Sequence, residues 1–198
     1  MEKFIKETSN IYRIKVPFEN IYTSVFLITT SNANVLVDCA TYDSDVDRFI
    51  VPSLTELGVS LESINYLILT HAHGDHAGGL KRILHYNSNI KVVKSGDEFS
   101  IDAIRLYALK GHTLDCVGVF DESTGTLISG DGLQGAGIGK YRCSITSKEE
   151  YLKTIEKIDK DDKIENILFS HAYEPWYKDY VKGREQIKQC LKACKNYI

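Results

Sequence analysis

Residues 70–79, with the sequence THAHGDHAGG, constrain the fold of this chain more than any other stretch. Four metal-ligating side chains fall within six positions there: His71, His73, Asp75 and His76. The apolar run at residues 64–69 predicts a buried strand, and residues 78–84 predict a helix. A loop between a strand and a helix can direct several side chains at one point. Imidazole and carboxylate groups are preferred ligands of zinc, iron and manganese, so the loop predicts a metal site.

The length and net charge of the chain limit the kinds of protein that it can be. The 198 residues are expected to form a single domain spanning residues 1–198. A net charge of −3, from 24 basic and 27 acidic residues, argues against a nucleic-acid partner. We find no export signal at the N-terminus and no apolar run of about 18 residues, which argues against a membrane protein. The five scattered cysteines fit reduced thiols, and we therefore expect a cytoplasmic protein.

Strand-rich and helical segments alternate twice along the chain. The first half predicts strands at residues 11–17, 21–30, 34–37 and 64–69, with helices at 44–57 and 78–85. The second half predicts strands at 90–94, 98–101, 104–110, 116–120, 126–129 and 164–169, with helices from a Ser147–Glu150 capping box and from about residue 178 or 182. Pro52 is expected to kink or restart the first helix. This alternation predicts an α/β fold of two packed sheets with helices outside, a four-layer αββα sandwich.

Three further ligand-type residues follow predicted strands. They are His112 in Gly111-His112-Thr113, Asp131 in Gly130-Asp131-Gly132 and His171 in Ser170-His171-Ala172. Taken singly, either histidine fits a structural role, and the aspartate fits a turn cap. A catalytic metal needs about three protein ligands and an open position, so the dense loop favours reading them together as ligands.

These motifs, in this order, resemble the metallo-β-lactamase fold superfamily. The loop resembles its HxHxDH signature, the three later segments resemble its later motifs, and Asp38 resembles its strand-end aspartate. The resemblance covers nearly the whole chain and implies the αββα sandwich. It also implies two divalent metal ions, with zinc expected and iron or manganese as alternatives. One ion would be bound by His71, His73 and His112, and the other by Asp75, His76 and His171, with Asp131 bridging them.

The implied chemistry is hydrolysis. Two such ions lower the pKa of bound water toward about 7, so that a hydroxide held between them can attack a carbonyl or phosphoryl centre. We expect an ester-like small-molecule substrate: a thioester, a lactone or a phosphodiester. The C-terminal segment after His171 is expected to be too short for the glutathione-binding domain of glyoxalase-type thioesterases. The oligomeric state is not indicated by the sequence.

Candidate catalytic and substrate-contacting residues come from the loops around these motifs. Asp75 and Tyr173 are the expected catalytic residues, with Tyr173 donating a hydrogen bond to the oxyanion or leaving group. Packing against Trp176 is the alternative role for Tyr173. Further candidate contacts with substrate are Asn20, Tyr22, Lys140, Tyr141 and Arg142, for which an ordinary surface role is equally compatible. Cys116 is expected to be structural.

Two other functions remain open. One is a mononuclear iron dioxygenase acting on persulfides, as in one branch of the superfamily, which uses chiefly the first-site ligands. The other is a non-catalytic metal-binding or sensor domain. Metal identity, oxygen consumption and turnover distinguish the three.

Overall fold

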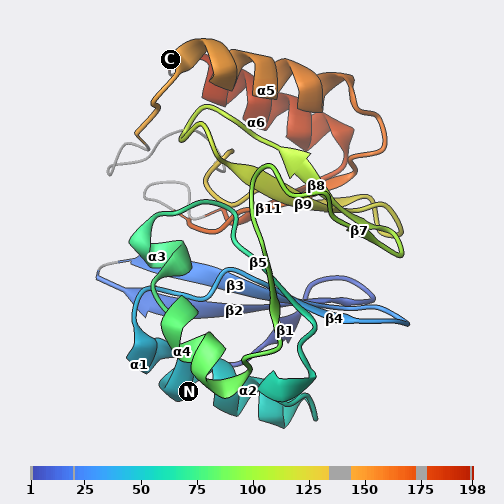
Figure 1. Cartoon of the computed structure of the whole chain (residues 1–198). Coiled ribbons are helices and arrows are strands. Elements are labelled where there is room, and N and C mark those ends of the chain that lie inside the picture. The colour runs from blue at the N-terminus through green and yellow to red at the C-terminus, as the bar shows by residue number, and fades with distance from the viewer. Residues whose placement is uncertain (1, 20, 134–143, 173–177, 197) are drawn as a thin grey trace. The chain divides into compact units, whose positions relative to one another are not determined.

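The computed structural model describes residues 2–19, 21–133, 144–172, 178–196 and 198. By its internal contacts the chain divides into two units, residues 1–97 (unit 1) and 98–198 (unit 2). Each unit contains a six-stranded sheet with helices packed on it (Figure 1). The organisation of residues 1–198 as a single domain stays a prediction.

The sheet of unit 1 has the strand order β1-β2-β3-β4-β5-β6. Its strands are β1 (Ile5–Lys6), β2 (Ile11–Phe18), β3 (Ile21–Thr29), β4 (Asn34–Val37), β5 (Tyr66–Ile68) and β6 (Lys91–Val93). The first four strands form an antiparallel meander, whereas β4, β5 and β6 are parallel. Parallel neighbours bring the carboxyl ends of β4 and β5 to the same edge of the sheet.

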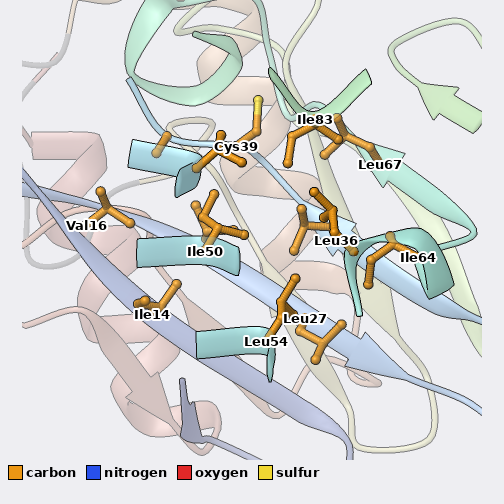
Figure 2. Packing of buried hydrophobic residues seen from close by; sticks show 14 of the residues in the cluster. Ile14, Val16, Leu27, Leu36, Cys39, Ile50, Leu54, Ile64, Leu67 and Ile83 are labelled. Carbon is orange, nitrogen blue, oxygen red and sulfur yellow. The ribbon is translucent and has the colours of Figure 1, made fainter. Parts of the chain in front are cut away.

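The helices of unit 1 bury one face of this sheet. They are α1 (Asp43–Asp45), η1 (Val46–Ile50), α2 (Val51–Glu56), η2 (Leu61–Ser63), α3 (Gly74–Ala77) and α4 (Leu80–Tyr86). Figure 2 shows Ile50 and Leu54 packed with Leu27 and Leu36 of the sheet, and Ile83 near Leu67. Alternate strand residues supply this core because side chains in a strand point to opposite faces in turn.

Unit 2 has the order β12-β11-β10-β9-β8-β7. Its strands are β7 (Ser100–Ile101), β8 (Ile104–Ala108), β9 (Val117–Asp121), β10 (Thr126–Ile128), β11 (Asn166–Leu168) and β12 (Tyr180–Lys182). Neighbours are antiparallel except β10 and β11, so β8, β10 and β11 all run in the same direction. Helices α5 (Lys148–Lys160) and α6 (Arg184–Asn196) pack on one face through residues such as Tyr151, Ile155 and Ile187.

Four segments differ from the sequence-based expectation. Residues 74–77, expected to belong to a loop, form the short helix α3, which carries Asp75 and His76. Residues 180–182 form strand β12 at the edge of the sheet, paired with β11, and the helix begins only after Gly183, whose φ is +78°. Strand β1 was not expected from the sequence. The expected helix at residues 44–57 is interrupted by the π-helical turn η1, which ends two residues before Pro52. The proline has no N–H to donate to the preceding turn.

Within the described residues, no helix is long and apolar enough to cross a membrane. The four cysteines among them (Cys39, Cys116, Cys190 and Cys194) are buried.

Candidate metal centre

In unit 1, the candidate ligands follow the carboxyl end of β5. The rings of His71 and His73 lie 4.6 Å apart between centroids, and those of His71 and His76 lie 4.2 Å apart. The Nε2 atom of His76 is 3.5 Å from Oδ2 of Asp75. His71 and His76 are buried, whereas His73 is exposed and the Asp75 side chain is 20% exposed. The loop thus gathers three imidazoles and a carboxylate, as the sequence predicted.

Asp38 orients this cluster from the end of the neighbouring strand β4. Its fully buried carboxylate accepts hydrogen bonds from the Thr70 backbone N–H (2.8 Å), the Thr70 hydroxyl (2.9 Å) and Nδ1 of His76 (2.7 Å). A carboxylate can only accept, so Nδ1 of His76 carries the proton and Nε2 presents its lone pair. This is the arrangement by which a second layer of residues fixes a metal-binding histidine.

The Thr70 hydroxyl links Asp38 to a second histidine, His71. Because its hydrogen points to Asp38, its oxygen is available to accept from Nδ1 of His71, at 3.2 Å. One buried carboxylate therefore orients two imidazoles. Sequence reasoning missed Thr70; its position between a buried strand and the first histidine was the available signal.

We expect Asp38→Asn to weaken zinc binding by about 10- to 100-fold. The amide NH₂ must face a hydrogen-bond donor, either the Thr70 N–H or Nδ1–H of His76. When the NH₂ group faces Nδ1–H of His76, the clash between the two donors is relieved only if the histidine proton moves to Nε2. Nε2 then has no lone pair left for a metal ion. Zinc affinity is measured by competition with a chromophoric chelator.

Asp45→Asn is the matched control for this variant. Asp45 is also a buried carboxylate of unit 1, and within the described residues it accepts hydrogen bonds from the backbone N–H groups of Thr41 and Tyr42. An amide oxygen can accept both bonds, so zinc affinity should remain at the wild-type value. Equal zinc affinity in Asp38→Asn and wild type would contradict the orienting role of Asp38.

The residues after Asp38 are hydrogen-bonded to the segment at residues 70–79, which we call the histidine loop. Asp38 and Ala40 have φ angles of +61° and +64°, an uncommon conformation for residues other than glycine. The Cys39 N–H and thiol both donate to the carbonyl of His76, at 2.8 and 3.3 Å, and the Gly78 N–H donates to the carbonyl of Ala40. The strained backbone at residues 38–40 is thus fixed by hydrogen bonds to the loop that it supports.

In unit 2, three candidate ligands follow β8, β10 and β11, whose carboxyl ends share one edge. Asp131 lies between two histidines: its Oδ1 is 3.2 Å from Nε2 of His171, and its Oδ2 is 3.7 Å from Nε2 of His112. All three side chains are buried. One carboxylate oxygen therefore faces each imidazole.

The tautomer of His112 is fixed by a backbone carbonyl. Nδ1 of His112 lies 2.6 Å from the carbonyl oxygen of Ser144, which can only accept, so Nε2 is the nitrogen left for a metal. Sequence reasoning missed Ser144, because a carbonyl group is common to every residue and leaves no signal in the sequence.

Cys116 fits its expected structural role. Burial raises the pKa of its thiol to about 11, and Sγ lies 3.0 Å from the Thr113 hydroxyl. A protonated thiol is a poor metal ligand at neutral pH.

All seven predicted ligands lie within the described residues, and each could supply a metal-binding atom. Their roles as ligands stay predictions. Tyr22 lies in β3 and is partly buried. The other predicted contacts lie outside the described residues: Asn20, Lys140, Tyr141, Arg142, Tyr173 and Trp176.

The chain is similar in sequence to known proteins of the metallo-β-lactamase superfamily. Residues 20–101 match the family model of the metallo-β-lactamase superfamily. The chain is 30% identical over 200 residues to a β-lactamase-like protein 2 homolog of Drosophila melanogaster, covering 84% of this chain and 66% of that protein. It is 24% identical over 157 residues to a hydroxyacylglutathione hydrolase of Legionella pneumophila, covering 67% and 62%. The chain spans 66%, 53% and 44% of the lengths of three curated β-lactamase-like relatives.

Solved structures show the same fold. A metallo-β-lactamase of Erythrobacter litoralis superposes with a TM-score of 0.76 at 18% identity, covering 98% of this chain and 96% of that one. A metallo-β-lactamase of Pseudomonas aeruginosa in its mono-zinc form gives 0.76 at 15% identity, covering 98% and 95%. The expected fold class, the αββα sandwich of the metallo-β-lactamase type, is confirmed.

Proposed function

Because the chain belongs to the metallo-β-lactamase superfamily, we propose that it is a binuclear metal-dependent hydrolase of an ester-like small molecule. The superfamily includes hydrolases, among them β-lactamases and hydroxyacylglutathione hydrolases. The candidate substrates are thioesters, lactones and phosphodiesters. We expect zinc as the metal, and a cytoplasmic location.

The donor set fits divalent metal ions. Hydrogen bonds from Nδ1 to Asp38 and to the Ser144 carbonyl leave Nε2 of His76 and His112 as lone-pair donors. The assignment of ligands follows the order of the family's motifs. We assign His71, His73 and His112 to one ion, Asp75, His76 and His171 to the other, and Asp131 to both.

The observation that carries the binuclear proposal is the position of Asp131. Its two oxygens face His112 and His171, which the motif order assigns to different ions. A carboxylate that faces ligands of both proposed ions can serve as the shared ligand. The mono-zinc state of the Pseudomonas aeruginosa relative makes the number of ions a quantity to be measured.

The bound metals would supply Lewis acidity and lower the pKa of a water molecule. The residues of the chain orient the reaction. Asp75 is the candidate to accept a proton from the attacking water, because its carboxylate is 20% exposed whereas that of Asp131 is 8% exposed. Tyr173, adjacent in sequence to the His171 segment, is proposed to donate a hydrogen bond to the oxyanion or leaving group.

Metal quantification with a substrate panel tests this function. We expect about two zinc ions per chain after reconstitution, and hydrolysis of at least one of the three substrate classes. A strong chelator should abolish hydrolysis, and added zinc should restore it. Fewer than about one metal per chain would overturn the proposal. Iron with oxygen consumption would instead favour the dioxygenase, and bound metal without turnover would favour the sensor domain.

A further inference from the structure

We propose that Thr146 and Thr154 are positioning residues that hold His112 in its metal-binding orientation. Together with Ser144 and Tyr151 they form what we call the α5 clamp, which packs helix α5 and its preceding turn against residues 110–112. The inference rests on the proposed function, because the orientation of His112 matters only if it is a ligand. It adds residues that the ligand motifs do not contain.

Residues 109–112 extend beyond the last residue of β8 and lack its regular pairing. Strand β8 ends at Ala108, and beyond it the only strand-like bond within the described residues is from Leu109 N–H to the Cys116 carbonyl, at 3.0 Å. A segment of this kind opens more easily than a paired strand. A ligand that follows it needs support from elsewhere to stay in place.

The turn before α5 supplies the first part of that support. The Thr146 hydroxyl donates to the His112 carbonyl at 2.6 Å, and the Thr146 N–H donates to the Gly111 carbonyl at 2.8 Å. The Ser147 N–H also donates to the Gly111 carbonyl, at 3.1 Å. In the capping box expected from the sequence, the Glu150 side chain would accept a hydrogen bond from the Ser147 N–H. In the structure the Ser147 N–H instead donates to the segment that carries His112, while the Ser147 hydroxyl still accepts from the Glu150 N–H.

The body of the helix supplies the second part. The buried hydroxyl of Thr154 donates to the Lys110 carbonyl at 2.7 Å. A threonine inside a helix commonly bonds the carbonyl four residues back, so a bond to another segment is informative. Tyr151 packs directly on Gly111, where an added Cβ would lie 2.5 Å from the tyrosine Cβ. With φ at +141°, position 111 admits only glycine comfortably, and this permits the close approach.

The clamp thus fixes both the backbone and the ring of His112. Two threonine hydroxyls converge on the carbonyls of residues 110 and 112, and the Ser144 carbonyl binds Nδ1 of the imidazole. Ordinary packing of α5 on the core accounts for Ile155 and Ile158, but it does not require these hydroxyls. Loss of either one should let the segment shift and weaken the bond that selects the tautomer.

The test compares Thr146→Val and Thr154→Val with Thr146→Ser and Thr154→Ser, which retain the hydroxyl. We expect each valine variant to bind zinc about tenfold more weakly, and each serine variant to remain within about twofold of wild type. Thr126→Val is the matched control, since it removes a buried hydroxyl that donates to the Thr124 carbonyl. It should bind zinc like wild type even if it unfolds at a lower temperature.

A second readout does not depend on metal. Long-range proton–nitrogen NMR of the metal-free protein, recorded at about pH 8, above the ordinary pKa of histidine, reports which ring nitrogen carries the proton. We expect a single Nδ1-protonated form of His112 in wild type and a mixture of tautomers in the valine variants. Unchanged ring signals in both valine variants would overturn the clamp. If wild type binds no metal, the proposed function fails, and the ring signals still decide the clamp separately.

Discussion

If Asp131 bridges the two proposed metal ions, Asp131→Asn should lose one of them and lower kcat/KM by about 10³-fold, which corresponds to about 4 kcal/mol of transition-state stabilisation. The substitution keeps the size of the side chain but removes its charge and replaces one oxygen by an NH₂ group. The native oxygens lie 3.2 and 3.7 Å from Nε2 of His171 and His112. An NH₂ group in either place cannot ligate a cation, so one of the two proposed ions would lose its shared ligand. Metal content and steady-state kinetics on the same preparation measure both effects.

Asp121→Asn is the matched control for that variant. Asp121 is another buried aspartate of unit 2, and its carboxylate accepts bonds from Ser123 and Thr124 in the turn between β9 and β10. Its substitution should lower stability while leaving metal content at the wild-type value. Asp131→Asn with full metal content and undiminished kcat/KM would rule out a bridging role for Asp131.

The candidate ligands were predictable because they combine two independent signals. The residue types are those that bind metals, and each group follows a segment that reads as a strand. Strands running in the same direction bring such residues to one edge of a sheet. This is why Asp131 and His171, although 40 positions apart in sequence, lie 3.2 Å apart in unit 2. The strand-end Asp38 was singled out by the family resemblance.

The groups that orient His112 were not predictable from the sequence. The acceptor for His112 is a main-chain carbonyl, and the bonds of Thr146 and Thr154 connect segments more than 30 residues apart. Hydroxyl side chains have many local partners, so their presence in a helix or turn does not indicate a distant one. The fold shows the same limit at β12: its three residues form a strand because β11 is available to pair with them.

The glycines of the histidine loop illustrate how the reason for a residue can be hidden. Gly78 and Gly79 read as the start of a helix, yet Gly78 has ordinary helical angles, with φ at −65° and ψ at −32°. Its backbone conformation therefore does not require glycine. An added Cβ, however, would overlap the carbonyl oxygens of Thr41 and Gly74. At Gly79 the overlap would be with the carbonyl oxygen of Cys39 and a methyl group of Val46.

Gly78→Ala should therefore destabilise the protein by more than about 4 kcal/mol, a cost reserved for severe disruption of packing. The atoms that a methyl group would meet belong to the backbone, and the Thr41 carbonyl follows Ala40, whose φ of +64° leaves little room for adjustment. Gly74→Ala is the control within the same loop, since position 74 has no atom within 4 Å of an added Cβ. Alanine there should be neutral or stabilise the protein by up to about 1 kcal/mol. Urea unfolding of the metal-free proteins separates this effect from metal binding. Similar unfolding midpoints for the two variants would show that the backbone at residues 38–41 does not confine the histidine loop.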